Sequence, residues 1–214
     1  MKFKALIGTM LILSAATTST AMAVEEGDWI VRAGWTSVNP KSDNSDLVSV
    51  KQAASLGLTL SYFFTDNLAV DVLAAYPFKH DIALIGGPTV ATTEHLPPTV
   101  SVQYHFLPTN AFKPYVGAGL NYTAFFSTKT TGPLEDSSLK LSSSWGLAGE
   151  VGVDIMLGES WLLNLSARYI DIETKARLDG DSLGKVAIDP YVYTFSAGYR
   201  FTSAEHRQFH TYLS

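Results

Sequence analysis

Eight segments of this sequence alternate, residue by residue, between large apolar side chains and small or polar ones. Residues 191–201 show this most clearly, because every aromatic residue among them has an odd number, while Thr194, Ser196 and Arg200 have even numbers. A period of two is the period of a β-strand. We therefore predict eight strands, within residues 29–36, 56–64, 68–76, 100–106, 116–122, 147–155, 161–169 and 191–201.

The connections between these strands decide which face is buried. A soluble β-sandwich would bury the aromatic face, whereas a membrane barrel turns that face to lipid. The connections alternate strictly between short ones, at 65–67, 107–111 and 158–160, and long ones, at 39–52, 78–97, 128–141 and 176–185. Short periplasmic turns, long extracellular loops and an even strand number are typical of outer-membrane barrels. The fold class predicted is all-β, an eight-stranded antiparallel transmembrane β-barrel.

Aromatic residues gather where the predicted strands end, at Tyr62–Phe64, Tyr104–Phe106 and Phe125–Phe126. Such clusters are typical of the girdles that mark the two membrane interfaces.

The N-terminal stretch has the features of a cleaved export signal. Lys2 and Lys4 precede an apolar run, and Ala21-Met22-Ala23 fits the small-residue cleavage site of a signal peptide. We predict a signal peptide at 1–23, a barrel at 24–201 and a C-terminal tail of unknown role at 202–214, with the protein in the cell outer membrane. Losing the two lysines takes the net charge from −5 to −7, and this acidic balance argues against a nucleic-acid partner.

The predicted interior is narrow and charged. Eight strands enclose little more than their own side chains, which excludes a wide aqueous pore. The inward-facing ionisable residues are Arg32, Asp71, Glu150, Asp154, Arg168 and Arg200. Their charges cancel, so the sequence favours a salt-bridged plug over the alternative of an ion-conducting path.

The extracellular half of the interior is predicted to be apolar. Leu73 and Ala75 face inward, and the adjoining connection carries Phe78, Leu84, Leu96 and Pro97. These residues either line a site for a small apolar ligand or pack the loops together, and the sequence leaves both interpretations open.

No catalytic, metal-binding or cofactor-binding pattern is present. The serines are scattered without a Gly-x-Ser-x-Gly elbow, there is no cysteine, and His206 and His210 lie in the tail without an acidic partner. We therefore predict a protein that is not an enzyme and that has no cofactor and no metal. A lipid-modifying enzyme is the least favoured alternative.

The residues also resemble a known family, the OmpW family of eight-stranded outer-membrane proteins, to which the hydrophobic-compound importer AlkL belongs. The resemblance extends from Gly27 to Phe201 and is carried by the segments 31–34, 65–67, 77–80, 95–99, 113–123 and 195–201. It implies a barrel whose outer half forms a hydrophobic channel, closed toward the periplasm, with lateral exit through the wall and with Leu73 and Arg168 among the lining residues. Two features depart from the family pattern: Arg168, where some relatives place a large aromatic residue, and the tail Thr202 to Ser214, because the family usually ends at the residue matching Phe201.

Together these observations predict passive transfer of small hydrophobic molecules through a narrow apolar channel. The alternative is a structural or interaction barrel whose extracellular loops act in adhesion, stress resistance or phage and bacteriocin reception. The expected partners are outer-membrane lipid and lipopolysaccharide, the barrel-assembly machinery and small hydrophobic solutes.

Overall fold

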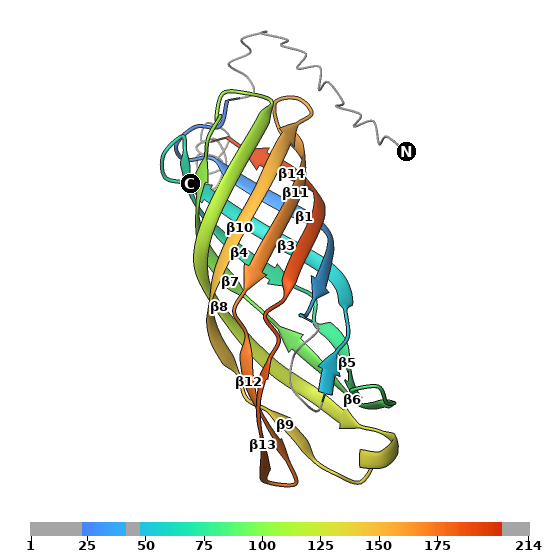
Figure 1. Ribbon diagram of the computed structural model, residues 1–214. Helices are drawn as coiled ribbons and strands as arrows, with labels where there is room; N and C mark the ends of the chain where they lie inside the picture. The colour runs from blue at the N-terminus through green and yellow to red at the C-terminus, as the bar shows by residue number, and fades with distance from the viewer. Residues whose placement is uncertain (1–22, 42–47, 203–214) are drawn as a thin grey trace, which may run out of the picture.

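A closed β-barrel forms the body of the protein (Figure 1). The structure is a computed structural model that describes residues 23–41 and 48–202; the predicted signal peptide up to residue 22, and the tail from residue 203, lie outside the described residues. Each strand pairs antiparallel with the next, and β8 pairs with β10 to close the ring. The predicted fold class is confirmed. The eight barrel strands are β1 (Trp29–Asn39), β3 (Ala53–Phe63), β4 (Leu68–Ala75), β7 (Thr99–His105), β8 (Phe112–Thr130), β10 (Ser144–Met156), β11 (Trp161–Ile170) and β14 (Tyr191–Phe201).

The first and last barrel strands lie side by side. The register sets Trp29 opposite Phe201 and Asn39 opposite Tyr191, with every residue between them paired. Both ends of the described barrel therefore lie on one side, the periplasmic side, as an even number of strands requires. Among the described residues no helix is long and apolar enough to cross a bilayer.

The outer surface of the barrel carries an apolar belt between two aromatic girdles. Exposed side chains of the belt include Leu58, Val102 and Leu165, which are 48–51% exposed. At the periplasmic rim Trp29 packs against Tyr62, with ring centroids 4.7 Å apart, and Trp161 packs against Tyr199 at 5.1 Å. The extracellular rim has matching ring pairs, which are Tyr122 with Trp145 and Tyr169 with Tyr191.

Much of the described part of the long connections forms strands that extend the barrel outward (Figure 1). On one side the outer half of β8 pairs with β6, β6 pairs with β5, and β5 pairs with β2. On the other side β9, β12 and β13 form a separate three-stranded sheet. The added elements are β2 (Val48–Val50), β5 (Phe78–Leu84), β6 (Thr89–Leu96), the short 3-10 helix η2 (Gly132–Leu134), β9 (Leu139–Leu141), β12 (Glu173–Leu178) and β13 (Asp181–Ala187).

Where the strands leave the membrane, the two faces of the sheet exchange character: apolar side chains point inward and charged side chains point outward. Inside the belt, charged residues such as Asp71 face the lumen, while leucines such as Leu58 and Leu165 face outward. In β5, by contrast, Phe78 and Ile82 are buried while Lys79 and Asp81 are exposed. Outside the lipid, water covers the outer face and an apolar core forms within, as in a soluble sheet.

Candidate functional site

A buried network of ion pairs fills the middle of the barrel. Arg32 on β1 donates two hydrogen bonds to Asp154 on β10, from Nε at 2.9 Å and from Nη2 at 2.5 Å. Its Nη1 donates to Ser61 Oγ at 2.6 Å and lies 3.8 Å from Asp71 on β4. Arg32, Asp71 and Asp154 are all at most 3% exposed. The network thus joins opposite walls of the barrel.

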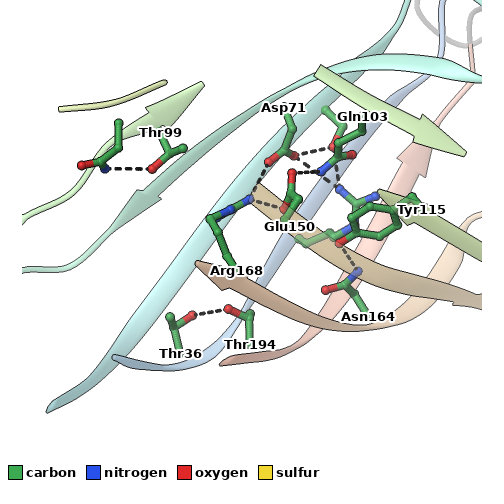
Figure 2. A network of polar contacts seen from close by, with 12 residues as sticks. Thr36, Asp71, Thr99, Gln103, Tyr115, Glu150, Asn164, Arg168 and Thr194 are labelled. Atoms are coloured by element: carbon green, nitrogen blue, oxygen red, sulfur yellow. Dashed lines mark hydrogen bonds and ion pairs between the residues drawn. The ribbon is translucent and has the colours of Figure 1, made fainter. Parts of the chain in front are cut away.

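Arg168 on β11 extends this network from the extracellular side (Figure 2). Its Nη2 lies 2.5 Å from Glu150 Oε2 and 3.4 Å from Asp71 Oδ2. Gln103 donates to the other Glu150 oxygen at 3.0 Å, and Asn164 donates to Asp154 at 2.8 Å. Each carboxylate is paired with an arginine, but two arginines face three carboxylates, so the charges of this network do not cancel as the sequence predicted.

Very little empty space remains at this level. The cavity lined by Arg32, Asp71, Leu73 and Arg168 has a volume of about 10 Å³, roughly the least that holds one water molecule. A solute of several atoms therefore has no passage through this layer as it stands in the structure.

The sixth ionisable residue, Arg200, lies below this network and has a different partner. Its Nε is 3.8 Å from Asp28, and its Nη1 donates to the carbonyl of Ala23. Beside it, six buried apolar residues close the periplasmic end: Val24, Ile30, Phe63, Ala69, Met156 and Leu162. Asp28 was not predicted, because it lies just before the first alternating segment and carries no pattern of its own.

Above the network the interior becomes apolar. A cluster that includes Val38, Phe78, Ile170 and Val192 spans the barrel where the strands leave the belt. Beyond it an apolar pocket of about 220 Å³ lies between the β2–β5–β6–β8 side and the β9–β12–β13 sheet. Its lining residues are Val48, Val50, His80, Ile82, Leu84, Val90, Thr93, His95, Phe125, Leu134, Leu139, Leu141, Thr174, Ala176, Leu178, Leu183, Val186 and Ile188.

The residues predicted to line a ligand site are spread over several levels. Leu84 lines the pocket. Phe78 and Ala75 belong to the apolar cluster beneath it, and Leu73 lies lower still, beside Arg168. Leu96 is half-buried, whereas Pro97 is buried. The lining role of each of these residues stays a prediction.

Most of the pocket was not predicted from the sequence, and two of its polar residues, His80 and His95, were not singled out. The reversed alternation of β5 and β6 places both side chains inward. Phe125, predicted in an interfacial girdle, instead lines the pocket. In the sequence, Phe78, His80 and Ile82 alternate with Lys79 and Asp81, and this pattern could have located His80 on the inner face. It is the pattern of a sheet whose outer face meets water, so the polar residues face outward and the others inward.

The barrel wall has a seam between β4 and β7. Their pairing ends at Leu73 opposite Thr99, and continuing the register would set Ala74 opposite Pro98 and Ala75 opposite Pro97. Proline has no N–H to donate. The Pro98 carbonyl accepts from Tyr122 N at 3.0 Å, so residue 98 directs its backbone polar groups toward β8, and the donor missing toward β4 is that of Pro97. The strand ladder is thus interrupted next to the apolar cluster.

Within residues 23–41 and 48–202, no three His, Cys, Asp or Glu side chains are grouped as a metal site would need.

A closed eight-stranded barrel with an apolar belt, two aromatic girdles and a sealed polar centre defines a small outer-membrane β-barrel protein. The chain belongs to the OmpW family, whose model matches residues 25–201. This confirms the resemblance predicted from the sequence and places the protein in the outer membrane.

Individual relatives agree with this membership. The chain is 46% identical over 211 residues to outer membrane protein W of Vibrio cholerae, covering 90% of this chain and 97% of that protein. Its fold is similar to the crystal structure of the outer membrane protein OprG from Pseudomonas aeruginosa, with a TM-score of 0.76, 36% identity and coverage of 84% of this chain and 98% of that one. It is also similar to the solid-state NMR structure of outer membrane protein AlkL in lipid bilayers, with a TM-score of 0.62, 26% identity and coverage of 83% and 92%.

Proposed function

We propose that the protein passes small hydrophobic molecules from the cell exterior into the outer membrane, without an energy source and without chemical change. The observation that carries this proposal is the apolar pocket of about 220 Å³ above a polar layer with about 10 Å³ of free space. An apolar solute gains free energy by leaving water for such a pocket, at about 25 cal/mol per Å² of buried surface. The pocket is smaller than the roughly 300–1,000 Å³ typical of drug-sized ligands, which favours small cargo.

We also propose that the solute leaves the pocket through the barrel wall. A solute in the pocket is separated from the periplasm by the charge network, which offers it no apolar surface. Phe78, 1% exposed, stacks on the pocket residue His95 with ring centroids 5.5 Å apart, and it belongs to the apolar cluster against which Ala75, beside the seam, packs. Movement of this ring would join the pocket to the seam at Ala74 and Pro98, and through it to lipid.

Uptake by whole cells tests both steps. A strain that lacks the gene is expected to take up a hydrophobic solute slowly, and re-expression of the protein is expected to restore uptake. Replacing Pro97 by alanine returns an N–H donor to the seam, so we expect a severalfold lower uptake rate, with unchanged solute binding to the purified protein. The matched control is Pro114→Ala, at a proline on β8 away from the seam. Unchanged uptake on deletion and re-expression would refute the transfer function, whereas unchanged uptake in the Pro97→Ala variant would refute only the exit.

A second candidate function, binding of lipopolysaccharide, is favoured by the outer face of the β9–β12–β13 sheet. The register sets Lys175 opposite Lys185 and Arg177 opposite Lys140, and all four side chains are exposed. Like charges directly opposite each other destabilise a sheet. Glu173 forms an ion pair with Lys185 at 2.7 Å. This carboxylate compensates one of the four positive charges. Phosphate groups of outer-leaflet lipopolysaccharide have the charge that would stabilise this face.

The double variant Lys140→Gln with Arg177→Gln is expected to weaken binding of lipopolysaccharide by about tenfold or more, because each basic side chain near an anionic membrane surface contributes about 1 kcal/mol. Binding is measured by titrating purified protein with lipopolysaccharide at low and high salt. Dephosphorylated lipopolysaccharide and the variant Lys79→Gln, at an exposed lysine of β5, are the controls. Equal binding by the double variant and the Lys79 variant would exclude this face as the binding site.

A further inference from the structure

Two neighbouring residues that line the apolar pocket have buried hydrogen-bonding atoms without a partner. Among the described residues that line it, four are polar: His80, Thr93, His95 and Thr174. The two threonines are satisfied within the protein, since Thr93 Oγ1 lies 2.9 Å from Thr128 Oγ1 and Thr174 Oγ1 donates to the Ser142 carbonyl at 2.7 Å. In contrast, His80 Nε2 and His95 Nδ1 are buried without a partner.

The backbone fixes the tautomer of His80. Its Nδ1 lies 2.5 Å from the carbonyl oxygen of Lys51, and because a carbonyl can only accept, Nδ1 carries the proton. In a neutral imidazole the other nitrogen is then an acceptor. Burial lowers the pKa of His80, which keeps the ring neutral at neutral pH. The free Nε2 of His80 therefore needs a hydrogen-bond donor.

His95 completes the site. Its ring stacks on that of His80, with centroids 4.8 Å apart and planes at 24°, and it packs against Phe78 and Phe125. Burial, and then the neighbouring His80, lower the pKa of His95 to about 3. Both rings are neutral, and both are at most 3% exposed, so bulk water does not reach the free nitrogens. A buried polar atom without a partner is unfavourable, and a ligand that supplies the partner gains affinity.

We propose that His80 and His95 recognise the hydroxyl group of a small, otherwise apolar molecule, an uncharged alcohol or phenol. A hydroxyl donates to His80 Nε2 and can accept from His95 when its Nδ1 carries the proton. Alkanes, ethers, ketones and carboxylates have no hydrogen to donate to His80. Amines are protonated at neutral pH, and a charge is disfavoured in this apolar surrounding. The inference rests on the proposed function, since it names which of the hydrophobic solutes the pocket prefers.

Three solutes of similar size test the preference: 1-octanol, which donates, 2-octanone, which only accepts, and octane, which does neither. For each we compare uptake by cells with and without the protein. The protein-dependent rate is expected to favour 1-octanol over 2-octanone by about tenfold, the upper range for one hydrogen bond.

Two variants of His80 separate recognition from folding. The amide of His80→Asn can keep the bond to the Lys51 carbonyl but places nothing at the Nε2 position, whereas His80→Gln places an amide oxygen near Nε2. We expect His80→Asn to reduce the preference for 1-octanol over 2-octanone to less than twofold, and His80→Gln to retain the preference. If His80→Asn slows all three solutes equally, His80 has a structural role and the recognition is refuted.

Direct binding distinguishes this inference from the transfer function. In lipid nanodiscs, the ¹⁵N resonance of His80 Nε2 is expected to shift on addition of 1-octanol and not on addition of octane. Protein-dependent uptake of all three solutes at equal rates, with no such shift, would overturn the hydroxyl site and leave the transfer function standing. A shift without any protein-dependent uptake would support the site and refute the transfer function. The uptake rates and the ¹⁵N shift of the wild-type protein test the hydroxyl site even if a His80 variant fails to fold.

Discussion

Replacing Asp154 by leucine is expected to lower the free energy of unfolding of the barrel by about 3–5 kcal/mol, the loss typical of a buried charge pair with one partner removed. Asp154 is 0% exposed and accepts two hydrogen bonds from Arg32. Without it, Asp71 is the one carboxylate left within 4 Å of the buried guanidinium, and Arg168 also contacts Asp71. The measurement is urea-dependent unfolding of the protein from lipid vesicles, followed by tryptophan fluorescence.

The matched control removes both charges. The double variant Arg32→Met with Asp154→Leu leaves no uncompensated arginine at this position, so we expect it to recover most of the stability lost in the single variant. A single variant as stable as the wild type would show that Asp71 alone compensates Arg32, and that the network is not a cooperative unit.

Replacing Ala176 by phenylalanine is expected to reduce protein-dependent uptake of hydrophobic solutes by at least tenfold. Ala176, on β12, lines the pocket and is 5% exposed. The pocket measures about 220 Å³, and a benzene-sized ring is accommodated by a cavity of about 150 Å³, so a new ring there leaves little room for cargo. Uptake by whole cells is the readout.

The control for this substitution is Ala197→Phe, which adds the same ring to the lipid-facing side of β14, where Ala197 is exposed. We expect normal uptake in this variant and equal amounts of both variants in the outer membrane. If Ala176→Phe transports as well as Ala197→Phe, the pocket is not on the route of the solute.

The membrane-spanning part of this fold could be predicted from the sequence because lipid imposes a simple rule. Between the girdles every second side chain faces hydrocarbon, so the alternation in segments such as 191–201 is strong, and all eight strands were found. The inward-facing charges followed from the same rule, since an arginine at position 32 or 168 has no place on the lipid side.

The pocket could not be predicted in the same way. In its walls the outward side chains meet water and are polar, whereas in the membrane-spanning part they meet lipid and are apolar. In β5 and β12 the outward positions carry lysine, arginine, aspartate or glutamate, and the sequence suggested loops there. Which histidine or phenylalanine faces inward depends on the register between distant strands, such as Phe78 opposite His95. Bulges in β5 and β6 shift that register, so the period alone does not place Phe125 on the inner face.

The sealed polar layer has a consequence for the cell as a whole. A general pore makes the outer membrane more permeable to every water-soluble compound of suitable size, antibiotics included, in proportion to its copy number. A barrel with about 10 Å³ of free space at its centre adds no such aqueous leak. A bacterium could therefore produce this protein in large amounts and keep its envelope resistant to hydrophilic toxins.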